Sequence, residues 1–507
     1  MLISAAASMA LLAKPISAIT PFLSCFEYPV PSSVRFPMMK KTMTKTVLAT
    51  MLALSGTMAA IPCTAAVDST IVTTQQALDN EGYVLGVNAY MWGSTLVRME
   101  QIARQYSDVS APQSDTSYRG PLNEFGHARR LSTPADTDMP TANRDTLYSS
   151  AVLDLSQGPL VLSVPDVTDR YYVINMFDMW HNLFQYVGTR ETGSLEKEIL
   201  IVPPGWKADG AIPRELNIVE APTSKVWLWG RTQVMGEDDY SAAHAIQDQY
   251  TLTPLTEYMG GESLQLRPLS PRPGRADDPL RFYVELGEYL KENPVDERQQ
   301  AMLGQLNKIG ISEQGFDRSR LSDTTISAMV KAVADGQKMV MAQQANPTTL
   351  EIKDGWVYAF NLDGFGDDNA MRSLIAHPYL GGQGAKEAVY PMAAMDTQGK
   401  PLTGQRSYTM KFDGEPPVDA FWSVTVYDAK SKMLVDNPIN RYSLNNLSDL
   451  KKSPDGSFEI TFSHQQPSAD TNWLPTPAEG FYVLTRLYIP SKSVLNMDWT
   501  VPGLEQR

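Results

Sequence analysis

The pattern of apolar and polar positions changes its period several times along this chain. From residue 75 to 106, apolar residues such as Leu78, Leu85 and Met99 recur at helical spacing, which predicts one long helix. Between about 140 and 236, short β-branched or aromatic runs alternate with Gly, Pro and Asp, which indicates an antiparallel β-unit. Its predicted strands are residues 147–155, 160–164, 171–176, 184–187, 199–202, 216–219 and 226–232.

A helical middle and a second β-unit follow. Helical periodicity returns in residues 241–252, 279–293, 296–309 and 322–345. Strand-like runs resume after residue 356, at residues 407–412, 421–427, 458–462 and 481–488. We therefore expect a mainly β protein with α-helices, in which two β-sandwich or jelly-roll-like domains are joined by a helical segment.

The predicted division places an N-terminal helix plus β domain at 67–255, a helical connector at 256–355 and a C-terminal β domain at 356–507. Residues 1–66 read as a leader, with its signal peptide at about 39–66: Lys40, Lys41 and Lys45 precede an apolar stretch and small residues around Ala65. The apolar stretch is shorter than the roughly 20 residues that span a bilayer, which favours cleavage over anchoring. We therefore expect a periplasmic or secreted protein without a membrane span after cleavage.

Charge and cysteine content limit the kinds of partner and of covalent cross-link that we expect for this protein. Removing residues 1–66 takes away five basic residues and one acidic one, which leaves 38 basic against 56 acidic and a net charge of −18. Such a chain repels phosphate backbones, so we expect no nucleic-acid partner, and neutral or cationic small molecules are easier to accommodate. Both cysteines, Cys25 and Cys63, lie in the predicted leader. The remaining chain would then lack disulfides and thiolate ligands. The sequence leaves the oligomeric state open.

Polar side chains interrupt the first β-unit, where burial of an unpartnered charge is costly. We expect these groups to line a polar site. A hydrolase acting on a carbohydrate or related small polar substrate would use Asp145 and Asp178 as acid and base, with His181 as a proton shuttle. That reading assumes that strand pairing brings the two carboxylates to one end of the sheet. The residues expected to contact substrate in this unit are Asn143, Arg144, Tyr148, Arg170 and Asn182.

Other interpretations of these residues stay open. Asp145 could serve as a helix-cap or turn residue, and Asp178 could form a buried ion pair with Arg170. No cofactor is predicted, although Asp178 and His181 with Asp145 or Asn143 would suit a divalent cation such as calcium or manganese. The chain lacks a Gly-x-Ser-x-Gly motif, and the glycines at 381–384 favour a tight loop over a dinucleotide site.

Aromatic residues gather in the second β-unit, where most are expected to be core. Trp473, in Asn-Trp-Leu-Pro, is expected in a proline-rich loop where it could stack on a ligand. Arg441 is expected either to contact that ligand or to pair with Asp428.

The ordered motifs resemble a known two-domain bacterial family, the domains of unknown function numbered 1254 and 1214. The first is carried by Asn143-Arg-Asp-Thr-Leu-Tyr148 and Asp169-Arg-Tyr-Tyr172, and the second by residues 419–428, 437–442 and 472–477. The resemblance covers roughly residues 80 to 500. It implies two β-rich domains, often exported, and by analogy carbohydrate binding in one half and enzymatic activity in the other.

Two functional hypotheses follow. The first is the exported hydrolase, and the alternative is a non-catalytic carbohydrate- or small-ligand-binding envelope protein that uses the same polar cluster. A structural or assembly protein is a third class, and it would require large exposed apolar faces.

Overall fold

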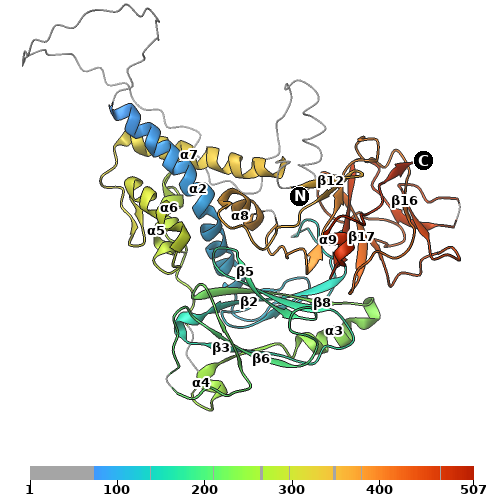
Figure 1. Cartoon of the computed structure of the whole chain (residues 1–507), viewed down its shortest axis with the longest axis horizontal. Helices are drawn as coiled ribbons and strands as arrows, with labels where there is room; N and C mark the ends of the chain where they lie inside the picture. Colours follow the sequence, from blue (N-terminus) through green and yellow to red (C-terminus); the bar gives the residue numbers. More distant parts are fainter. Residues whose placement is uncertain are drawn as a thin grey trace, which may run out of the picture.

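The computed structural model describes residues 74–507, except residues 138, 209, 263–266, 296, 346–349, 378 and 469. The predicted leader lies outside these residues. The described chain forms two β-sandwiches and a group of helices (Figure 1). The helices lie above the N-terminal sandwich, and the C-terminal sandwich lies beside them. The expected class, two β-sandwich domains with helices between them, is confirmed.

The N-terminal sandwich packs a five-stranded sheet on a four-stranded sheet. In order, the larger sheet contains β1 (Gly126–His127), β2 (Thr146–Asp154), β8 (Lys225–Gln233), β4 (Tyr172–Phe177) and β5 (Leu183–Gly188). The smaller sheet contains β7 (Asn217–Glu220), β6 (Lys197–Val202), β3 (Leu160–Val164) and β9 (Thr251–Pro254). Alternate residues of the strands point between the two sheets, and Leu153, Leu162 and Leu228 are among the core that results.

The helical group covers the opposite face of the five-stranded sheet. Helix α2 (Thr74–Ser107) packs against α7, α5 and α8 (Figure 1). These helices span Asp323–Ala342, Arg281–Leu290 and Asn369–Ala376. Small residues let α2 and α7 approach closely, since a Cβ on Gly86 would lie 2.8 Å from the Ala332 Cβ. The division of the chain at residues 255 and 356 stays a prediction.

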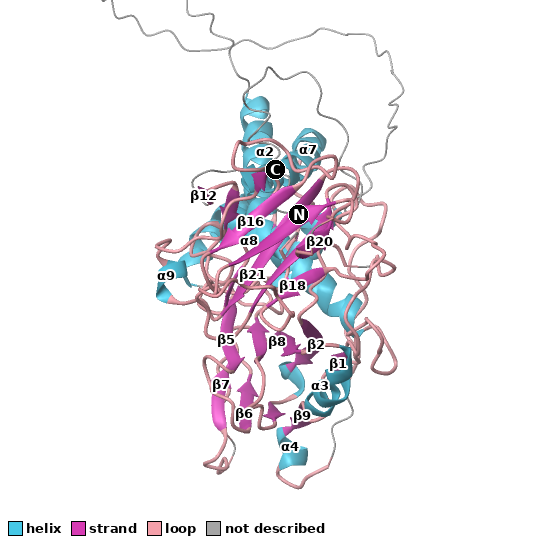
Figure 2. Ribbon diagram, turned by 90° about the vertical axis from the view of Figure 1, so that its right-hand side faces the viewer, coloured by secondary structure: helices cyan, strands magenta, loops and turns pink. Residues whose placement is uncertain are grey.

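The C-terminal sandwich pairs a seven-stranded sheet with a four-stranded one, and its strands occupy the upper part of Figure 2. The first sheet contains β12 (Glu351–Lys353), β13 (Trp356–Tyr358), β15 (Met392–Ala393), β21 (Phe481–Tyr488), β17 (Trp422–Asp428) and β18 (Ser443–Asn445), with β14 (Ala388–Val389) beside β21. The second contains β20 (Asn472–Pro475), β19 (Phe458–Ser463), β16 (Tyr408–Phe412) and β22 (Glu505–Gln506). Their core includes Trp422, Ile460 and Phe481.

Several predicted elements differ from the observed ones. The helix expected over 241–252 ends at Gln247 as α3 (Tyr240–Gln247), and residues 251–254 instead form β9. Strand β20 replaces the loop expected around Trp473, because it pairs in parallel with β19. Helix α8 was not predicted. None of the described helices is both long enough and apolar enough to cross a membrane.

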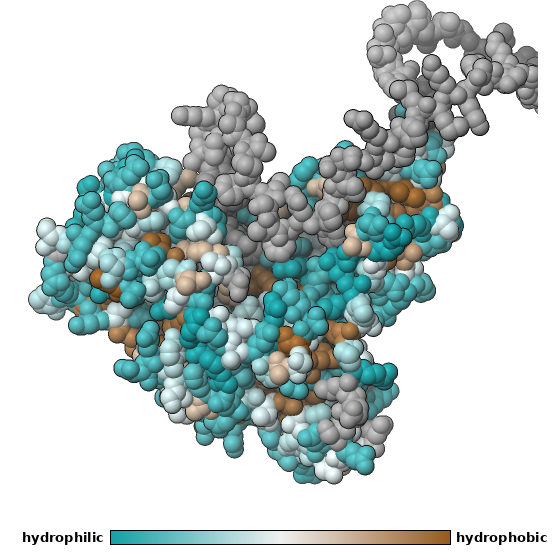
Figure 3. Space-filling view, turned by 180° about the vertical axis from the view of Figure 1, so that it is seen from behind, coloured by the Kyte–Doolittle hydropathy of each residue, from teal (hydrophilic) through white to brown (hydrophobic). Residues whose placement is uncertain are grey.

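The surface seen in Figure 3 is mostly hydrophilic, with separate apolar areas. Among the described residues, the exposed large apolar side chains lie on several different elements, for example Val84 on α2, Ile218 on β7 and Met339 on α7.

Candidate functional site

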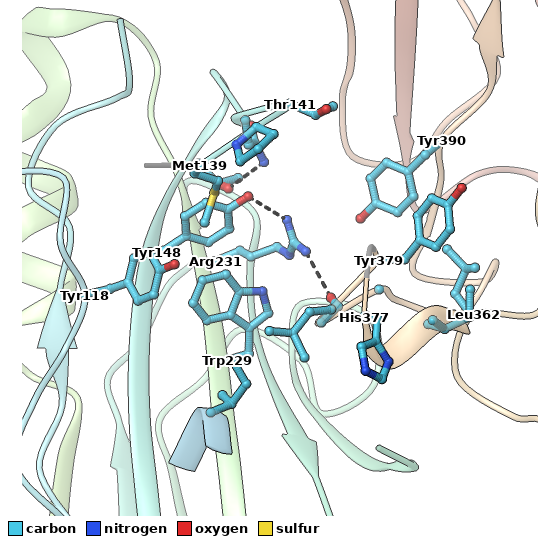
Figure 4. A pocket seen from close by; sticks show the side chains of 18 of the residues that line it. Tyr118, Met139, Thr141, Tyr148, Trp229, Arg231, Leu362, His377, Tyr379 and Tyr390 are labelled. Carbon is cyan, nitrogen blue, oxygen red and sulfur yellow. Dashed lines mark hydrogen bonds between the residues drawn. The ribbon is translucent and has the colours of Figure 1, made fainter. Parts of the chain in front are cut away.

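A cavity of about 770 Å³ lies where the five-stranded sheet, the helices and the C-terminal sandwich meet. Figure 4 shows Tyr148, Trp229 and Arg231 on one side of it and His377, Tyr379 and Tyr390 on the other. Its wall also includes Arg98 of α2 and Arg486 of β21. Since these elements are far apart in the sequence, only the folded chain forms this cavity.

Strand β8 supplies the sheet side of the wall. Its residues alternate between the two faces of the sheet, so that Val226 and Leu228 enter the sandwich core. Trp227, Trp229 and Arg231 therefore share the other face, and all three line the cavity. Because both faces of β8 are covered, the strand reads as a continuous apolar run that Arg231 interrupts.

Aromatic rings form part of the cavity surface in this wall. The rings of Tyr148 and Trp229 are stacked, with centroids 4.4 Å apart and an interplanar angle of 18°. Tyr118 meets Trp229 edge-on at 4.8 Å. Residues 118, 148 and 229 come from a loop and two neighbouring strands, so both the loop and the sheet position these rings. Such a surface suits a planar or ring-shaped ligand.

Arg231 stands beside this surface and is 7% exposed. Its Nη1 donates to the Tyr148 hydroxyl at 3.4 Å and its Nη2 to the Gly381 carbonyl at 3.2 Å, as the dashed lines in Figure 4 show. Its Nε has no hydrogen-bond partner. Within the described part of the chain, Arg231 forms no ion pair with a carboxylate.

The described lining of the wall is basic. It contains five arginines and one carboxylate, Asp136, which is paired with Arg130. The buried carboxyl of Asp145 lies close enough to Arg486 to help raise the pKa of its guanidinium. His377 adds no charge at neutral pH, because burial lowers its pKa to about 4. The cavity thus differs from the acidic chain around it, and the expectation of neutral or cationic ligands does not fit its wall.

Of the ten residues predicted from the sequence to form a site, Asn143 and Tyr148 line this cavity. The Asn143 amide donates to the Tyr488 hydroxyl and to Thr146 Oγ1, both at 2.9 Å, and its oxygen accepts from the Asp145 N–H. Asn143 therefore serves mainly to join the two sandwiches. Tyr148 contributes its ring and its hydroxyl to the cavity.

Asp145 belongs to the same junction and does not line the cavity. Its carboxylate accepts a hydrogen bond from Ser423 Oγ of β17 at 2.6 Å. Burial raises its pKa, an effect that Arg486 and Ser423 oppose. The alternative of a helix-cap or turn role is wrong for this side chain, because its partner comes from the other sandwich.

Asp178 and His181 lie in a buried turn after β4. The Asp178 carboxylate accepts from the backbone N–H groups of Trp180 and Asn182 and from the Asn182 amide, all within 2.9 Å. His181 Nε2 accepts from the Gly381 N–H at 3.2 Å. Burial raises the pKa of Asp178 to about 6 and lowers that of His181 to about 3. Both side chains have structural partners, and neither lines the cavity.

The sheet register separates Asp145 from Asp178. Strands β2 and β4 both run antiparallel to β8, so they run parallel to each other. Asp145 precedes Thr146, which pairs with Gln233, whereas Asp178 follows Phe177, which pairs with Trp227. Six residues of β8 span about 20 Å. The expected approach of the two carboxylates is therefore wrong, and they cannot act as an acid–base pair on one bond.

The other predicted residues also have partners away from the cavity. Arg170 pairs with Asp169 and Asp239, so the alternative ion pair with Asp178 is wrong. Arg144 donates to the Ser132 carbonyl at 2.6 Å.

In the C-terminal sandwich, the Trp473 indole is buried and donates to the Ser463 carbonyl at 3.0 Å, so its predicted exposure in a loop is wrong. Arg441 donates to the Trp473 carbonyl instead of pairing with Asp428.

The ligand set considered for a divalent cation is not brought together either, because Asp145 lies at the opposite end of the sheet from Asp178 and His181. Among the described residues, no group of three or more His, Cys, Asp or Glu side chains is placed to hold a metal ion.

The sequence contained a signal for Arg231, which interrupts the apolar run Val-Trp-Leu-Trp-Gly of β8. The same signal, a charged residue next to an apolar strand segment, is the basis for the prediction of Asp145. His377 and Tyr390 carried no such signal, since they reach the cavity from irregular segments around α8 and β15.

Comparisons with known proteins find two domain models that match parts of the chain. The model of the family described as "Protein of unknown function (DUF1254)" matches residues 122–254, and that described as "Protein of unknown function (DUF1214)" matches residues 387–492. No curated protein matches the chain.

Two solved structures are similar to it. The VPA0106 protein from Vibrio parahaemolyticus is 23% identical, with a TM-score of 0.64, and the match covers 84% of this chain and all of that one. An uncharacterized protein from Burkholderia cenocepacia is 13% identical, with a TM-score of 0.39 and coverage of 85% and 94%. The first of these shares the fold. The chain therefore carries a DUF1254 match followed by a DUF1214 match, the two-domain arrangement that its motifs resemble.

Proposed function

We propose that this protein binds a small, ring-shaped organic molecule in the cavity between its sandwiches and helices, without acting on it chemically. The predicted leader would place this binding in the periplasm or outside the cell. One observation carries the proposal: a cavity of about 770 Å³ has a wall of stacked aromatic rings beside a buried guanidinium.

The composition of the wall supports binding over hydrolysis. Ligand sites are concave, mostly apolar and aromatic, and contain a few placed polar groups. Here the stacked rings of Tyr148 and Trp229 offer aromatic surface, and Arg231 and Tyr390 offer polar atoms close by. Asp136, the carboxylate among the described residues of the wall, is held by Arg130. The pair of carboxylates that glycoside hydrolysis requires is missing from the described wall.

Titration with the fluorescent probe 8-anilinonaphthalene-1-sulfonate tests this proposal. We expect saturable binding of one probe per chain, with quenching of tryptophan fluorescence, because Trp227 and Trp229 line the cavity. A Trp229→Leu substitution removes one stacked ring, and we expect the affinity to fall about threefold to tenfold.

Trp473→Leu is the matched control, because Trp473 is also a buried tryptophan but lies outside the cavity. Both variants are compared at a temperature where circular dichroism shows them folded. Absence of saturable binding by the wild type, or equal loss in the two variants, would contradict the proposal.

A further inference from the structure

Arg231 is a buried cation of the cavity wall that forms no ion pair with a carboxylate among the described residues. A guanidinium stays protonated in proteins, so its charge must be balanced or solvated wherever it lies. Arg130 has Asp136 and Asp115, and Arg170 has Asp169 and Asp239. The described partners of Arg231 are uncharged, the Tyr148 hydroxyl and the Gly381 carbonyl.

A second donor next to Arg231 also lacks an acceptor. Trp229 Nε1 is buried and has no hydrogen-bond partner, and Arg231 Nε is in the same state. The two residues are two positions apart on β8, so both side chains leave the same face of the sheet. Both line the cavity. Buried donors without acceptors are costly, and an occupant that brings acceptor oxygens would remove that cost.

We infer that the molecule bound here is a small organic anion, with a carboxylate or another oxyanion at Arg231 and its ring on the Tyr148–Trp229 wall. This inference rests on the proposed function and adds the charge of the ligand to it. The planar guanidinium matches two oxygens of an oxyanion at once. The stacked rings lie directly beside that position, since the Arg231 guanidinium is 5.3 Å from the centre of the Tyr148 ring.

The occupant is a free small molecule instead of a polymer or a membrane surface. Arg231 is 7% exposed, so a nucleic-acid backbone or a layer of lipid headgroups would not reach it without opening the fold. The net charge of −14 for the whole chain also repels extended polyanions. A small anion is affected mainly by the local charge of the wall, whose described residues include five arginines and one aspartate.

Two probes with the same aromatic body test the inference on the full chain. 8-Anilinonaphthalene-1-sulfonate carries one negative charge, and N-phenyl-1-naphthylamine is its neutral counterpart. We expect the wild type to bind the sulfonate roughly tenfold to a hundredfold more tightly, as a charge-assisted hydrogen bond in a buried site would give. Raising the salt concentration is expected to weaken this preference little, because buried charges are poorly screened.

Substitutions assign the preference to one residue. Arg231→Met is expected to abolish the preference for the sulfonate, and Arg231→Lys is expected to retain part of it. Arg441→Met is the control, because Arg441 is exposed and lies outside the cavity.

The outcomes separate this inference from the proposed function. Binding of neither probe by the wild type would overturn the proposed function and the inference together. Equal affinity of the wild type for both probes would overturn the inference alone. A preference that survives in a folded Arg231→Met variant would overturn the assignment to Arg231, and the wild-type comparison decides the inference even if that variant does not fold.

Discussion

At the scale of single residues, the turn after β4 holds two buried titratable groups with opposite effects on stability. Asp178 and His181 resembled catalytic residues because they are polar groups in an apolar segment. Each instead completes the hydrogen bonds of a buried backbone segment, through Trp180 and Asn182 for Asp178 and through Gly381 for His181. A carboxyl whose pKa is raised in the folded state and an imidazole whose pKa is lowered give pH dependences of opposite sign.

For Asp178, stability is expected to fall as the pH rises. The folded pKa of about 6 lies above the ordinary 3.8, so the folded state binds the proton more tightly than the unfolded state between these values. This contribution is complete below pH 4 and is lost as the pH rises through 6, which amounts to about 2 kcal/mol between pH 4.5 and 7.

Asp178→Asn keeps an oxygen for the turn but cannot ionise. Urea unfolding at both pH values should show that the variant lacks this loss of about 2 kcal/mol. Identical pH dependence in the variant and the wild type would contradict the raised pKa.

For His181, stability is expected to fall as the pH falls. Its Nε2 accepts from the Gly381 N–H and must stay unprotonated, in line with a folded pKa of about 3 against the usual 6.5. The unfolded state binds the proton more tightly, so stability is lost as the pH falls below 6.5, by about 2 kcal/mol between pH 7 and 5.

His181→Asn should remove that loss in urea unfolding, and asparagine tolerates the left-handed backbone here, with φ of 57°. His464→Asn, at an exposed imidazole, is the control. A variant as sensitive to acid as the wild type would exclude His181 as the source.

At the scale of elements, the strands could be predicted and their pairing could not. The runs at 147–155, 160–164 and 481–488 correspond closely to β2, β3 and β21, because burial on one or both faces leaves a pattern in the sequence. Register leaves no such pattern. The parallel relation of β2 and β4 depends on β8, which lies some 70 residues after β2, and it decides that Asp145 and Asp178 lie apart.

Local features of the sequence predict turns better than they predict the pairing of distant strands. The glycines at 381–384 were expected to form a tight loop, and Gly381 lies in a turn after α8 with φ of 72°. Its backbone approaches the cavity wall so closely that a Cβ would lie 2.8 Å from Trp229 Nε1. The turn therefore needs glycine for its backbone angle and for the space beside Trp229.

Gly381→Ala is expected to lower the free energy of unfolding by about 2–4 kcal/mol, since the backbone strain adds to the displacement of Trp229. Binding of 8-anilinonaphthalene-1-sulfonate should weaken with it. Gly399→Ala is the control: Gly399 has φ of 74° and nothing within 4 Å of its Cβ position, so it bears the backbone strain of about 1–2 kcal/mol alone. Equal effects of the two substitutions on binding would show that contact with Trp229 is unimportant.

At the scale of the whole molecule, the segment that identifies the family holds the two sandwiches together. The backbone of residues 141–142 accepts hydrogen bonds from Arg486 and Tyr427, and Asn143 donates to Tyr488. These contacts lie along one edge of the cavity, so joining the sandwiches and shaping the cavity depend on the same residues. From its sequence this segment resembles a catalytic centre, because a motif of polar residues gives no indication of whether its partners are ligands or another domain.

The Asp145–Ser423 hydrogen bond tests this role of the segment. Asp145 is buried, and its Oδ2 accepts a hydrogen bond from Ser423 Oγ at 2.6 Å. Ser423→Ala would leave a buried carboxylate without that donor, at a cost of about 1–3 kcal/mol in the free energy of unfolding. The loss should grow as the pH rises, because the ionised form is the one that needs the donor.

Ser457→Ala removes a similar bond at the surface, from Ser457 Oγ to Asp455 Oδ1 at 2.7 Å, where water replaces the lost donor. Urea unfolding should show a much smaller change in this variant. If Ser423→Ala were as mild as Ser457→Ala, the junction would depend on apolar contacts such as that of Tyr171 with Phe421, and the polar motif would have another role. A large loss specific to Ser423→Ala, accompanied by weaker probe binding, would show that the junction also maintains the cavity.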